Sequence, residues 1–481
     1  MQLPYNSGER EGFAALPGSV LTMPCGHVAW PCPSAYRPTS SQAAESLHMR
    51  DYFSADVLSF RTLSNRSTAA IIFVVLGVVS HPAIAGDWPQ WLGPTRNGVS
   101  PETLTPWSEF PTATWTRETA SGFSVPVVAD GILFVHASVP DKDEEGVIAV
   151  DSKTGKDLWH DTYSRVPYSS QLGVGPRATP SVVNGRLFTT GITGVISCYD
   201  ARTGKRFWQM NPWEDLKVPR PGFGVCASPV VVDGKLIVAV GGEGSSIVAY
   251  DTETGEVSWR ALDEPAGAAS PIVIVRGEGA ERQNEVIAQT TLRLVGLSPH
   301  DGAIRWEHPL VFEPSGVSPT SLVIGNRLIC STQDTGTMSL TIPVGNESDV
   351  PTLQWWKQDL SSYFSTGSVD ANGLAFIVTN QLMPLPRADV RCLEIESGEE
   401  KWIAQGIGYF HVGIIRLADG KLLTLNDAGT VALSEPQEKE LVQLATGKAC
   451  GGTFSNPVLS DGYLYVRDAA TVTCFNLNAT P

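Results

Sequence analysis

An eleven-residue motif that recurs along the chain is the feature that most constrains its fold. Its clearest copies read AVDSKTGKDLW at 149–159, CYDARTGKRFW at 198–208 and AYDTETGEVSW at 249–259. Two looser copies read GLSPHDGAIRW at 296–306 and CLEIESGEEKW at 392–402. A period of about 50 residues indicates one supersecondary unit that is stacked several times, because a single unit of this size cannot bury its apolar face alone.

Two sets of markers predict eight units. The glycines of the motif are spaced by 49, 51, 47 and 96 residues, the last being two periods, and they are Gly155, Gly204, Gly255, Gly302 and Gly398. The unit ends are marked by Leu441, in a degraded copy, and by Trp115, Trp159, Trp208, Trp259, Trp306, Trp356 and Trp402. The second marker is the residue that opens an apolar run in each unit, namely Pro126, Pro180, Pro229, Pro271, Pro319, Ser368, Ile415 and Pro457.

Each unit reads as four short strands that are joined by tight turns. Dipeptides such as Asp130-Gly131 separate the first two apolar runs, and the glycine of the motif separates the last two. The 46 glycines and 34 prolines favour short strands and turns over long helices. We therefore predict an all-β fold, an eight-bladed β-propeller with four-stranded antiparallel blades over 113–478. The strand around Trp115 is expected to complete the last blade and to close the ring, which removes two exposed sheet edges.

The recurring residues of the motif have a structural interpretation. Glycine supplies the positive φ that a tight turn needs. The small residue that opens the motif, Ala149 in the first copy, is expected to leave room for a tryptophan from a neighbouring blade. Because every copy repeats these residues, we interpret the tryptophans and glycines as packing residues that stabilise the blades, and not as a cofactor site.

The N-terminal part carries the pattern of an export signal. Arg61 and Arg66 precede the apolar run 69–79, and a small-x-small signal-peptidase pattern ends at Ala85. The run is too short to span a bilayer as a helix. We favour a signal peptide over a buried core helix and predict cleavage after Ala85. The mature chain is then periplasmic or secreted and has no transmembrane span.

The pattern divides the chain before the propeller into three parts. Residues 1–48 are unpatterned, and either a disordered leader or a mis-assigned start explains them. Residues 49–85 contain the signal peptide, and residues 86–112 form an N-terminal segment ahead of the first strand.

Composition excludes several classes of protein. The 34 basic and 50 acidic residues give a net charge of −16, which argues against nucleic acid as a partner. Eight cysteines without a CxxC pair argue against zinc fingers, attached haem and thioredoxin-type chemistry. We expect a monomer. The pairing of the cysteines within the repeats stays open for Cys198, Cys226, Cys330, Cys392, Cys450 and Cys474.

The motif at 149–159 resembles the tryptophan-docking repeat of the pyrroloquinoline quinone (PQQ) propeller superfamily. That superfamily includes quinoprotein alcohol dehydrogenases and the outer-membrane assembly factor BamB. The segment 87–94, DWPQWLGP, also resembles the mature start of exported PQQ-like propellers of planctomycete-type bacteria. The resemblance covers 87–478 and implies an eight-bladed propeller. It leaves the function open, because the repeat stabilises blades whether or not a quinone is bound.

The resemblance also implies what an enzyme of this family would need. Its enzymes hold PQQ with calcium in the central funnel through acidic and amide ligands, beside a catalytic Asp and commonly a disulfide between adjacent cysteines. This sequence has no adjacent cysteine pair, and no Glu/Asn/Asp trio can be placed. We therefore expect no cofactor and assign no catalytic or metal-binding residue. Asp141, Asp143 and Glu145 imitate the start of a calcium loop, but Ser152 stands where the last ligand should be, so we interpret them as a solvated hairpin.

The channel of the predicted propeller offers a few candidate residues. Three residues before each run-opening position, the units read Phe123, Arg177, Cys226, Ala268, Gly316, Ser365, Val412 and Phe454. Arg177, the charged member, either grips an anion or carboxylate or forms a structural ion pair. His411 is either a base or ligand or a packed channel residue. Tyr409, beside it, and Tyr363, in the preceding unit, are further candidates.

Two functions remain after this reasoning. We favour an exported, non-catalytic scaffold that binds other periplasmic or outer-membrane proteins, as in BamB. The alternative is a PQQ-dependent alcohol or sugar dehydrogenase with reduced loops, in which Arg177 would contact the quinone carboxylates.

Overall fold

The structure is a computed structural model that describes residues 86–478, apart from 171–172, 278–281, 311–318, 344–349 and 383–384. The chain separates into two units, Met1–Ser80 and His81–Pro481, and the second contains every described residue. The predicted signal peptide and the leader before it lie outside the described residues.

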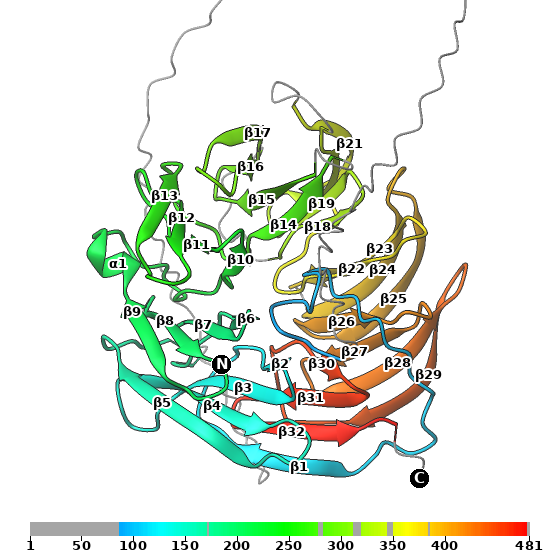
Figure 1. The fold of residues 1–481 in the computed structure, drawn as a ribbon. Coiled ribbons are helices and arrows are strands. Elements are labelled where there is room, and N and C mark those ends of the chain that lie inside the picture. Colours follow the sequence, from blue (N-terminus) through cyan, green and yellow to red (C-terminus); the bar gives the residue numbers. More distant parts are fainter. Residues whose placement is uncertain are drawn as a thin grey trace, which may run out of the picture. The chain divides into compact units, whose positions relative to one another are not determined.

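Eight four-stranded antiparallel sheets form the blades of a propeller, which confirms the predicted fold class (Figure 1). We number the blades from 1 to 8 along the chain. Blades 1 and 2 consist of β2 (Val127–Ala129), β3 (Ile132–Ser138), β4 (Glu144–Asp151), β5 (Asp157–Ser164), β6 (Ser181–Val183), β7 (Arg186–Thr190), β8 (Ile196–Asp200) and β9 (Arg206–Met210). Blades 3 and 4 consist of β10 (Val230–Val232), β11 (Lys235–Ala239), β12 (Ile247–Asp251), β13 (Val257–Ala261), β14 (Ile272–Arg276), β15 (Gln283–Gln289), β16 (Arg293–Leu297) and β17 (Ile304–Pro309).

The second half of the ring repeats this arrangement. Blades 5 and 6 consist of β18 (Leu322–Ile324), β19 (Arg327–Thr332), β20 (Gly336–Thr341), β21 (Thr352–Lys357), β22 (Ser368–Val369), β23 (Leu374–Gln381), β24 (Arg387–Glu394) and β25 (Glu400–Gly408). Blades 7 and 8 consist of β26 (Val412–Arg416), β27 (Leu422–Asn426), β28 (Thr430–Pro436), β29 (Leu441–Lys448), β30 (Val458–Ser460), β31 (Tyr463–Arg467), β32 (Thr471–Asn476) and β1 (Ala113–Glu118). A short helix, α1 (Pro212–Asp215), lies between blades 2 and 3. No helix among the described residues has the length and apolar composition to cross a membrane.

The first strand of the chain closes the ring. β1 pairs with β32 and becomes the outer strand of blade 8, with Trp115 opposite Cys474. The two ends of the propeller therefore share one sheet, and the ring is held at this point by backbone hydrogen bonds in addition to side-chain packing.

Five docking tryptophans pack against the glycine turn of the next blade, namely Trp115, Trp159, Trp208, Trp259 and Trp355. Trp402 instead donates to the Gln437 carbonyl in a turn of blade 7 without glycine, and Trp306 donates to Glu285 of its own blade. Trp159 of blade 1 covers Gly204 of blade 2, where a Cβ would lie 2.5 Å from the indole. Its Nε1 also donates to the Ala201 carbonyl at 3.0 Å. Glycine is needed at this turn because its φ is +72° and because the ring fills the space of a side chain.

The prediction for the small residue of the motif is wrong. Ala149 is paired with Trp159 of its own blade across β4 and β5. It therefore accommodates the tryptophan of the same blade, whereas the tryptophan of the neighbouring blade lies on the glycine of the turn.

In blade 5 the docking residue is Trp355, and the assignment of Trp356 is wrong by one residue. Trp355 Nε1 donates to the Ile395 carbonyl at 2.8 Å, and its ring covers Gly398 of blade 6. Trp356 Nε1 donates instead to the Thr335 carbonyl of its own blade at 2.6 Å. Successive strand residues point to opposite sides, so only one of two adjacent tryptophans can reach the next blade.

In blade 7, Leu441 begins the outer strand instead of ending it, and Ala445 holds the place of the docking tryptophan. Residues from the N-terminal segment cover this seam. Trp107 Nε1 donates to the Thr446 carbonyl at 3.0 Å, and the Phe110 ring lies against Gly447.

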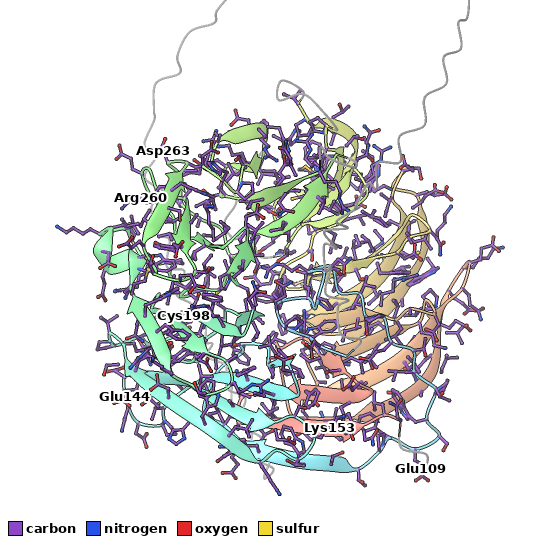
Figure 2. The ribbon with its side chains drawn as sticks, in the orientation of Figure 1. Glu109, Glu144, Lys153, Cys198, Arg260 and Asp263 are labelled. Carbon is purple, nitrogen blue, oxygen red and sulfur yellow. The ribbon has the colours of Figure 1, made fainter. Side chains whose placement is uncertain are left out.

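Apolar side chains fill the spaces between the blades (Figure 2). Phe134 of blade 1, for example, shares one buried cluster with Leu187 and Tyr199 of blade 2. Five of the six described cysteines belong to this packing, Cys226 lies at a channel position, and no disulfide forms among the described residues. Cys198, Cys330, Cys392 and Cys474 are buried, and Cys226 and Cys450 are half-buried.

Candidate functional site at the mouth of the channel

The connectivity of each blade gives the propeller two unlike faces. Turns join its first strand to its second and its third to its fourth at one end. The loops between its second and third strands, and the passages to the next blade, lie at the other end, which we call the mouth face. The channel candidates precede the inner strands, so they lie at the mouth face.

Strand register corrects two of the predicted channel positions. In blades 6 and 7 the residues that hold the proline place are Gly367 and Ile414, because Ser368 and Ile415 pair with the second strand where Val230 does in blade 3. The residues three positions earlier are Phe364 and His411, and not Ser365 and Val412. The error arose because the first turn of blades 6 and 7 is one residue longer than the two-residue turn of blades 1, 2, 3, 5 and 8.

An aromatic cluster forms where four of these positions meet. The Phe454 ring of blade 8 lies 5.6 Å from the ring of Phe123 in blade 1 and 5.6 Å from that of Phe364 in blade 6. His411 of blade 7 lies 6.2 Å from the same ring. The Tyr363 ring packs edge-on against Phe364 at 4.0 Å. The structure thus brings together His411 and Tyr363, two of the predicted candidates, through shared phenyl rings.

His411 is a packed residue of this cluster. Its side chain is 2% exposed, and its Nδ1 is 3.0 Å from the Ser365 hydroxyl. Burial lowers the pKa of His411 to about 4, although Asp427 and Asn456 act in the opposite direction. The imidazole is therefore neutral at neutral pH. Its Nε2 is buried, and the Asn456 side chain and the Ser455 backbone lie beside the ring.

Arg177 holds two loops of the mouth face. Its guanidinium donates to the Phe223 carbonyl, to the Ser170 hydroxyl at 3.2 Å and to the Gly173 carbonyl at 3.4 Å. It also interacts with Cys226, whose thiol pKa burial raises. These contacts favour the structural interpretation of Arg177, because its planar donors are directed at backbone carbonyls.

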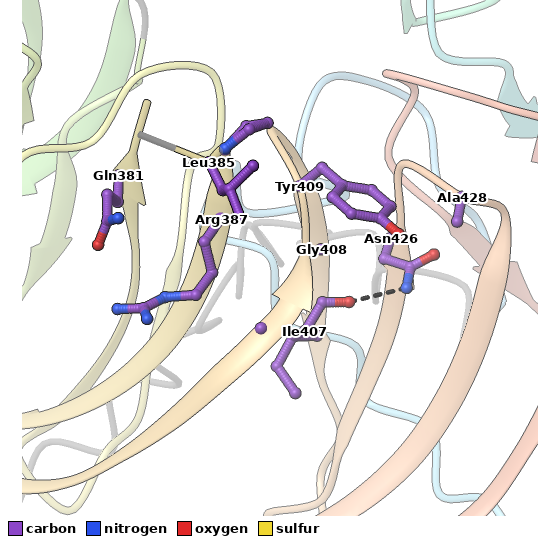
Figure 3. A pocket seen from close by; sticks show the side chains of 10 residues that line it. Gln381, Leu385, Arg387, Ile407, Gly408, Tyr409, Asn426 and Ala428 are labelled. Carbon is purple, nitrogen blue, oxygen red and sulfur yellow. Dashed lines mark hydrogen bonds between the residues drawn. The ribbon is translucent and has the colours of Figure 1, made fainter. Parts of the chain in front are cut away.

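Tyr409 lines a pocket of about 600 Å³ at the outer part of the mouth face (Figure 3). The walls come from blades 6 and 7 and include Leu385, Ile407 and Asn426. Asn426 Nδ2 donates to the Ile407 carbonyl at 2.7 Å and fixes one wall. The loop that carries Tyr409 is held by Asp427, which accepts the Tyr409 amide at 3.0 Å.

A buried polar chain in blade 1 escaped the sequence analysis. His136 Nε2 is 2.7 Å from the Tyr163 hydroxyl, which donates to Glu145 Oε2 at 2.9 Å. Glu145 also accepts the Ile192 amide of blade 2 at 3.1 Å. Burial raises the pKa of Glu145 to about 7 and lowers that of His136 to about 3. The spacing of Phe134 and His136 could have predicted the burial of His136. Side chains two residues apart in a strand point to the same side, and Phe134 packs against blade 2.

The donor set at the mouth does not fit a calcium ion. Calcium takes six to eight oxygen ligands, whereas the described channel positions supply phenyl rings, an imidazole, a thiol and a guanidinium. The predicted position Gly316 lies outside the described residues. The nearby acids are used by loops: Asp427 accepts the amide of Tyr409, and Asp468 accepts that of Gly451 at 3.0 Å. Among the described residues no group of three or more His, Cys, Asp or Glu side chains could hold a metal.

The loop that imitates a calcium site is also explained by the structure. Asp143 lies 3.5 Å from Arg165, and Glu145 turns inward to Tyr163. Glu145 also lies 3.6 Å from Arg165, so both carboxylates face the same guanidinium. Because Glu145 is fully buried, the interpretation of a solvated hairpin is wrong for this residue.

Comparison with known proteins defines the family. Residues 143–404 match the family model described as outer membrane protein assembly factor BamB. The chain belongs to this BamB-type propeller family. Several curated relatives that share part of its sequence are named as alcohol dehydrogenases. A quinohemoprotein alcohol dehydrogenase of Comamonas testosteroni is 32% identical over 161 residues, 31% of this chain and 21% of the relative. A 1-butanol dehydrogenase (cytochrome c) of Thauera butanivorans is 33% identical over 139 residues, 27% of this chain and 18% of the relative. The chain thus spans about a fifth of the length of these relatives.

Solved structures agree on the fold of this BamB-type propeller. A europium-containing methanol dehydrogenase superposes with a TM-score of 0.59 at 16% identity, covering 80% of this chain and 90% of that chain. BamB from Moraxella catarrhalis superposes with a TM-score of 0.54 at 15% identity, covering 79% of this chain and 99% of that chain. At such identity the likeness concerns the propeller fold alone.

Proposed function

We propose that the protein is an exported, non-catalytic scaffold that binds other proteins of the cell envelope through its mouth face. The observation that carries this proposal is that exposed aromatic side chains gather on the mouth face. Among the described residues, the aromatic side chains that are more than about a third exposed on the mouth face are Phe223, Tyr409, Phe410 and Phe454. The remaining two, Phe207 and Trp356, lie on outer strands, and none lies on the opposite face.

Exposed aromatic residues of this kind are typical of protein interfaces. Phe223 is 62% exposed and Tyr409 is 61% exposed. Aromatic side chains are enriched at interfaces, where they fill pockets of the partner and lose little entropy on binding. The pocket beside Tyr409 offers the complementary feature, because Leu385 and Ile407 line it with apolar surface. The exposed aromatic side chains and this pocket together favour a partner that presents an apolar side chain of its own.

The loops that carry these residues are held in place before any partner binds. Arg177 joins the loop of Phe223 to that of Gly173, and Asp427 accepts the amides of Tyr409 and Phe410. A surface that is already ordered loses less conformational entropy on association. This rigidity supports a docking role for the mouth face.

The second candidate function is a PQQ-dependent dehydrogenase, which the partial likeness to quinoprotein alcohol dehydrogenases supports. The donor set at the mouth speaks against it, since no carboxylate among the described channel positions is available for the calcium ion that accompanies the quinone. We therefore place this function second and derive no reaction step from it.

Site-specific photo-crosslinking in cells tests the scaffold proposal. A photoreactive phenylalanine is placed at Phe223 or Tyr409, and at Val275 as a control, which is 52% exposed at the end of the inner strand β14 on the opposite face. We expect one adduct of the same mass from both mouth positions and none from Val275. Equal adducts from all three positions, or no adduct from either mouth position, would contradict the proposal. Fractionation of the same cells and N-terminal sequencing test export, and we expect the mature chain to begin at Gly86.

A further inference from the structure

We infer that residues 88–102 form an axial plug, a segment of the chain that makes hydrogen bonds to all eight blades from the face opposite the mouth. Figure 1 shows this blue segment among the inner strands of the ring. Its sequence, WPQWLGPTRNGVSPE, contains the WPQW motif that the repeat analysis did not explain. In the structure this segment binds the ring of blades of its own chain.

Hydrogen bonds of 2.6 to 3.2 Å join the plug to every blade. In blade order, they join Trp88 to Val128, Pro89 to Val182, Arg96 to Ser228, Arg96 to Pro271, Trp91 to Thr320, Asn97 to Ser368, Ser100 to Arg416, and Glu102 to Gly462. The inner strand of each blade is a sheet edge with unpaired backbone groups. The plug pairs with the backbone of three inner strands, at Val128, Val182 and Arg416. It reaches the other five blades at hydroxyls or at residues beside the inner strand, and it ties together blades that are not neighbours.

Arg96 is the central contact of the plug. Its Nη1 donates to the Pro229 carbonyl at 3.1 Å, and its Nη2 donates to the carbonyls of Ser228 at 3.2 Å and Pro271 at 2.9 Å. Gln90 of the plug accepts a further hydrogen bond at 3.2 Å. These acceptors form a carbonyl socket between blades 3 and 4. A planar guanidinium with divergent donors matches such a socket, whereas a lysine ammonium does not.

The socket holds a buried charge without a carboxylate partner. Arg96 is 4% exposed, and none of the ion pairs among the described residues includes it. Burial lowers the pKa of Arg96 to about 9, so the side chain is still charged at neutral pH. A buried cation is stable only where several acceptors replace its water. The four acceptors around Arg96 do this for its two terminal nitrogens, whereas its Nε is buried without a hydrogen-bond partner among the described residues. The socket therefore matches the forked end of a guanidinium.

The backbone of the plug is also strained. Leu92 and Arg96 have φ angles of +59° and +53°, a region that residues other than glycine rarely adopt. Such conformations persist only where the surrounding contacts determine them. Gly93 completes the turn: its φ is +79°, and a Cβ there would lie 2.9 Å from the Trp88 ring. The segment is therefore shaped to its site by local sequence and by the ring.

Thermal unfolding of the mature chain tests the plug with three variants. We expect Arg96→Ala and Arg96→Lys to lower the melting temperature by roughly 5 °C or more. We expect Arg202→Ala, which changes an exposed arginine in a turn of blade 2, to leave it within about 1 °C. Guanidinium at low millimolar concentration should raise the melting temperature of Arg96→Ala, because it refills the socket, and should leave that of Arg96→Lys unchanged. Equal stability of Arg96→Ala and Arg202→Ala would overturn the inference.

Hydrogen exchange of the unmodified chain provides a second test that does not depend on folding of a variant. The amides of Ser100 and Val182 donate across the plug interface, and the amide of Val128 donates to Trp88. We expect these amides to exchange as slowly as those of β3 in the core. Faster exchange at all three positions would show that the segment leaves the ring without unfolding it, and the inference would be wrong.

Discussion

Trp115 and Gly155 meet at the seam where the ring closes. The indole of Trp115 lies where a side chain of Gly155 would be, with a Cβ placed 2.8 Å from its Cδ2. Trp115 Nε1 donates to the Ser152 carbonyl at 3.0 Å. Because β1 is also the outer strand of blade 8, this single tryptophan joins the last blade to the first.

The first prediction concerns this seam. Gly155→Ala should destabilise the protein by about 2–4 kcal/mol, because alanine adds backbone strain at φ +69° and also displaces the Trp115 ring. Gly131→Ala is the matched control, since its φ is +73° but no atom lies within 4 Å of the added Cβ. It should cost only about 1 kcal/mol. Urea unfolding measures both, and equal losses would show that Trp115 does not depend on Gly155.

The second prediction separates the two adjacent tryptophans of blade 5. Trp355→Ala should cost about 3–5 kcal/mol, because the side chain fills the seam to blade 6 and donates to Ile395. Trp356→Ala should cost less than half as much, because its side chain is more than a third exposed. The comparison uses denaturant midpoints of the two variants. A larger loss of stability for Trp356→Ala would show that Trp356 is the docking residue of blade 5, as the spacing predicted.

The repeat could be predicted from sequence because its signals are local. The spacing of glycines and tryptophans sufficed for eight blades and for ring closure by the strand around Trp115. Register failed in blades 6 and 7, where a longer turn shifted the count by one and placed Ser365 and Val412 at the positions that Phe364 and His411 hold. The plug could not be predicted, since Arg96 and Pro271 are 175 residues apart and no periodicity relates them. The contacts of the aromatic cluster could not be predicted either, because its rings come from four different blades.

The third prediction concerns acid sensitivity. Burial lowers the pKa of His411 to about 4 from the usual 6.5. The unfolded chain therefore binds a proton at higher pH than the folded one. The contribution of His411 to the free energy of unfolding is therefore largest above pH 6.5. It decreases by about 3 kcal/mol in total as the pH falls towards 4. His411→Gln should flatten this part of the profile in unfolding experiments from pH 7 to 4. An unchanged slope would show that His411 does not carry the effect.

The fourth prediction has the opposite sign. Burial raises the pKa of Glu145 to about 7, so the folded protein favours the protonated carboxyl. The contribution of Glu145 to the free energy of unfolding is present at pH 4.5 and decreases as the pH rises to about 7. Glu145→Gln keeps an acceptor for Tyr163 and removes the charge. Its stability relative to the unmodified chain should therefore increase with pH over this range. A difference that is constant with pH would contradict the role of burial.

Calorimetric titration of PQQ and calcium into the purified mature chain tests the central claim most directly. The mouth of the channel presents the phenyl rings of Phe123, Phe364 and Phe454 and a guanidinium that is bound to loop carbonyls. We therefore predict no saturable heat at one quinone per chain, and no dye reduction with alcohols or sugars. Stoichiometric binding of PQQ, with turnover of any of these substrates, would contradict the scaffold account and establish the protein as a quinoprotein dehydrogenase.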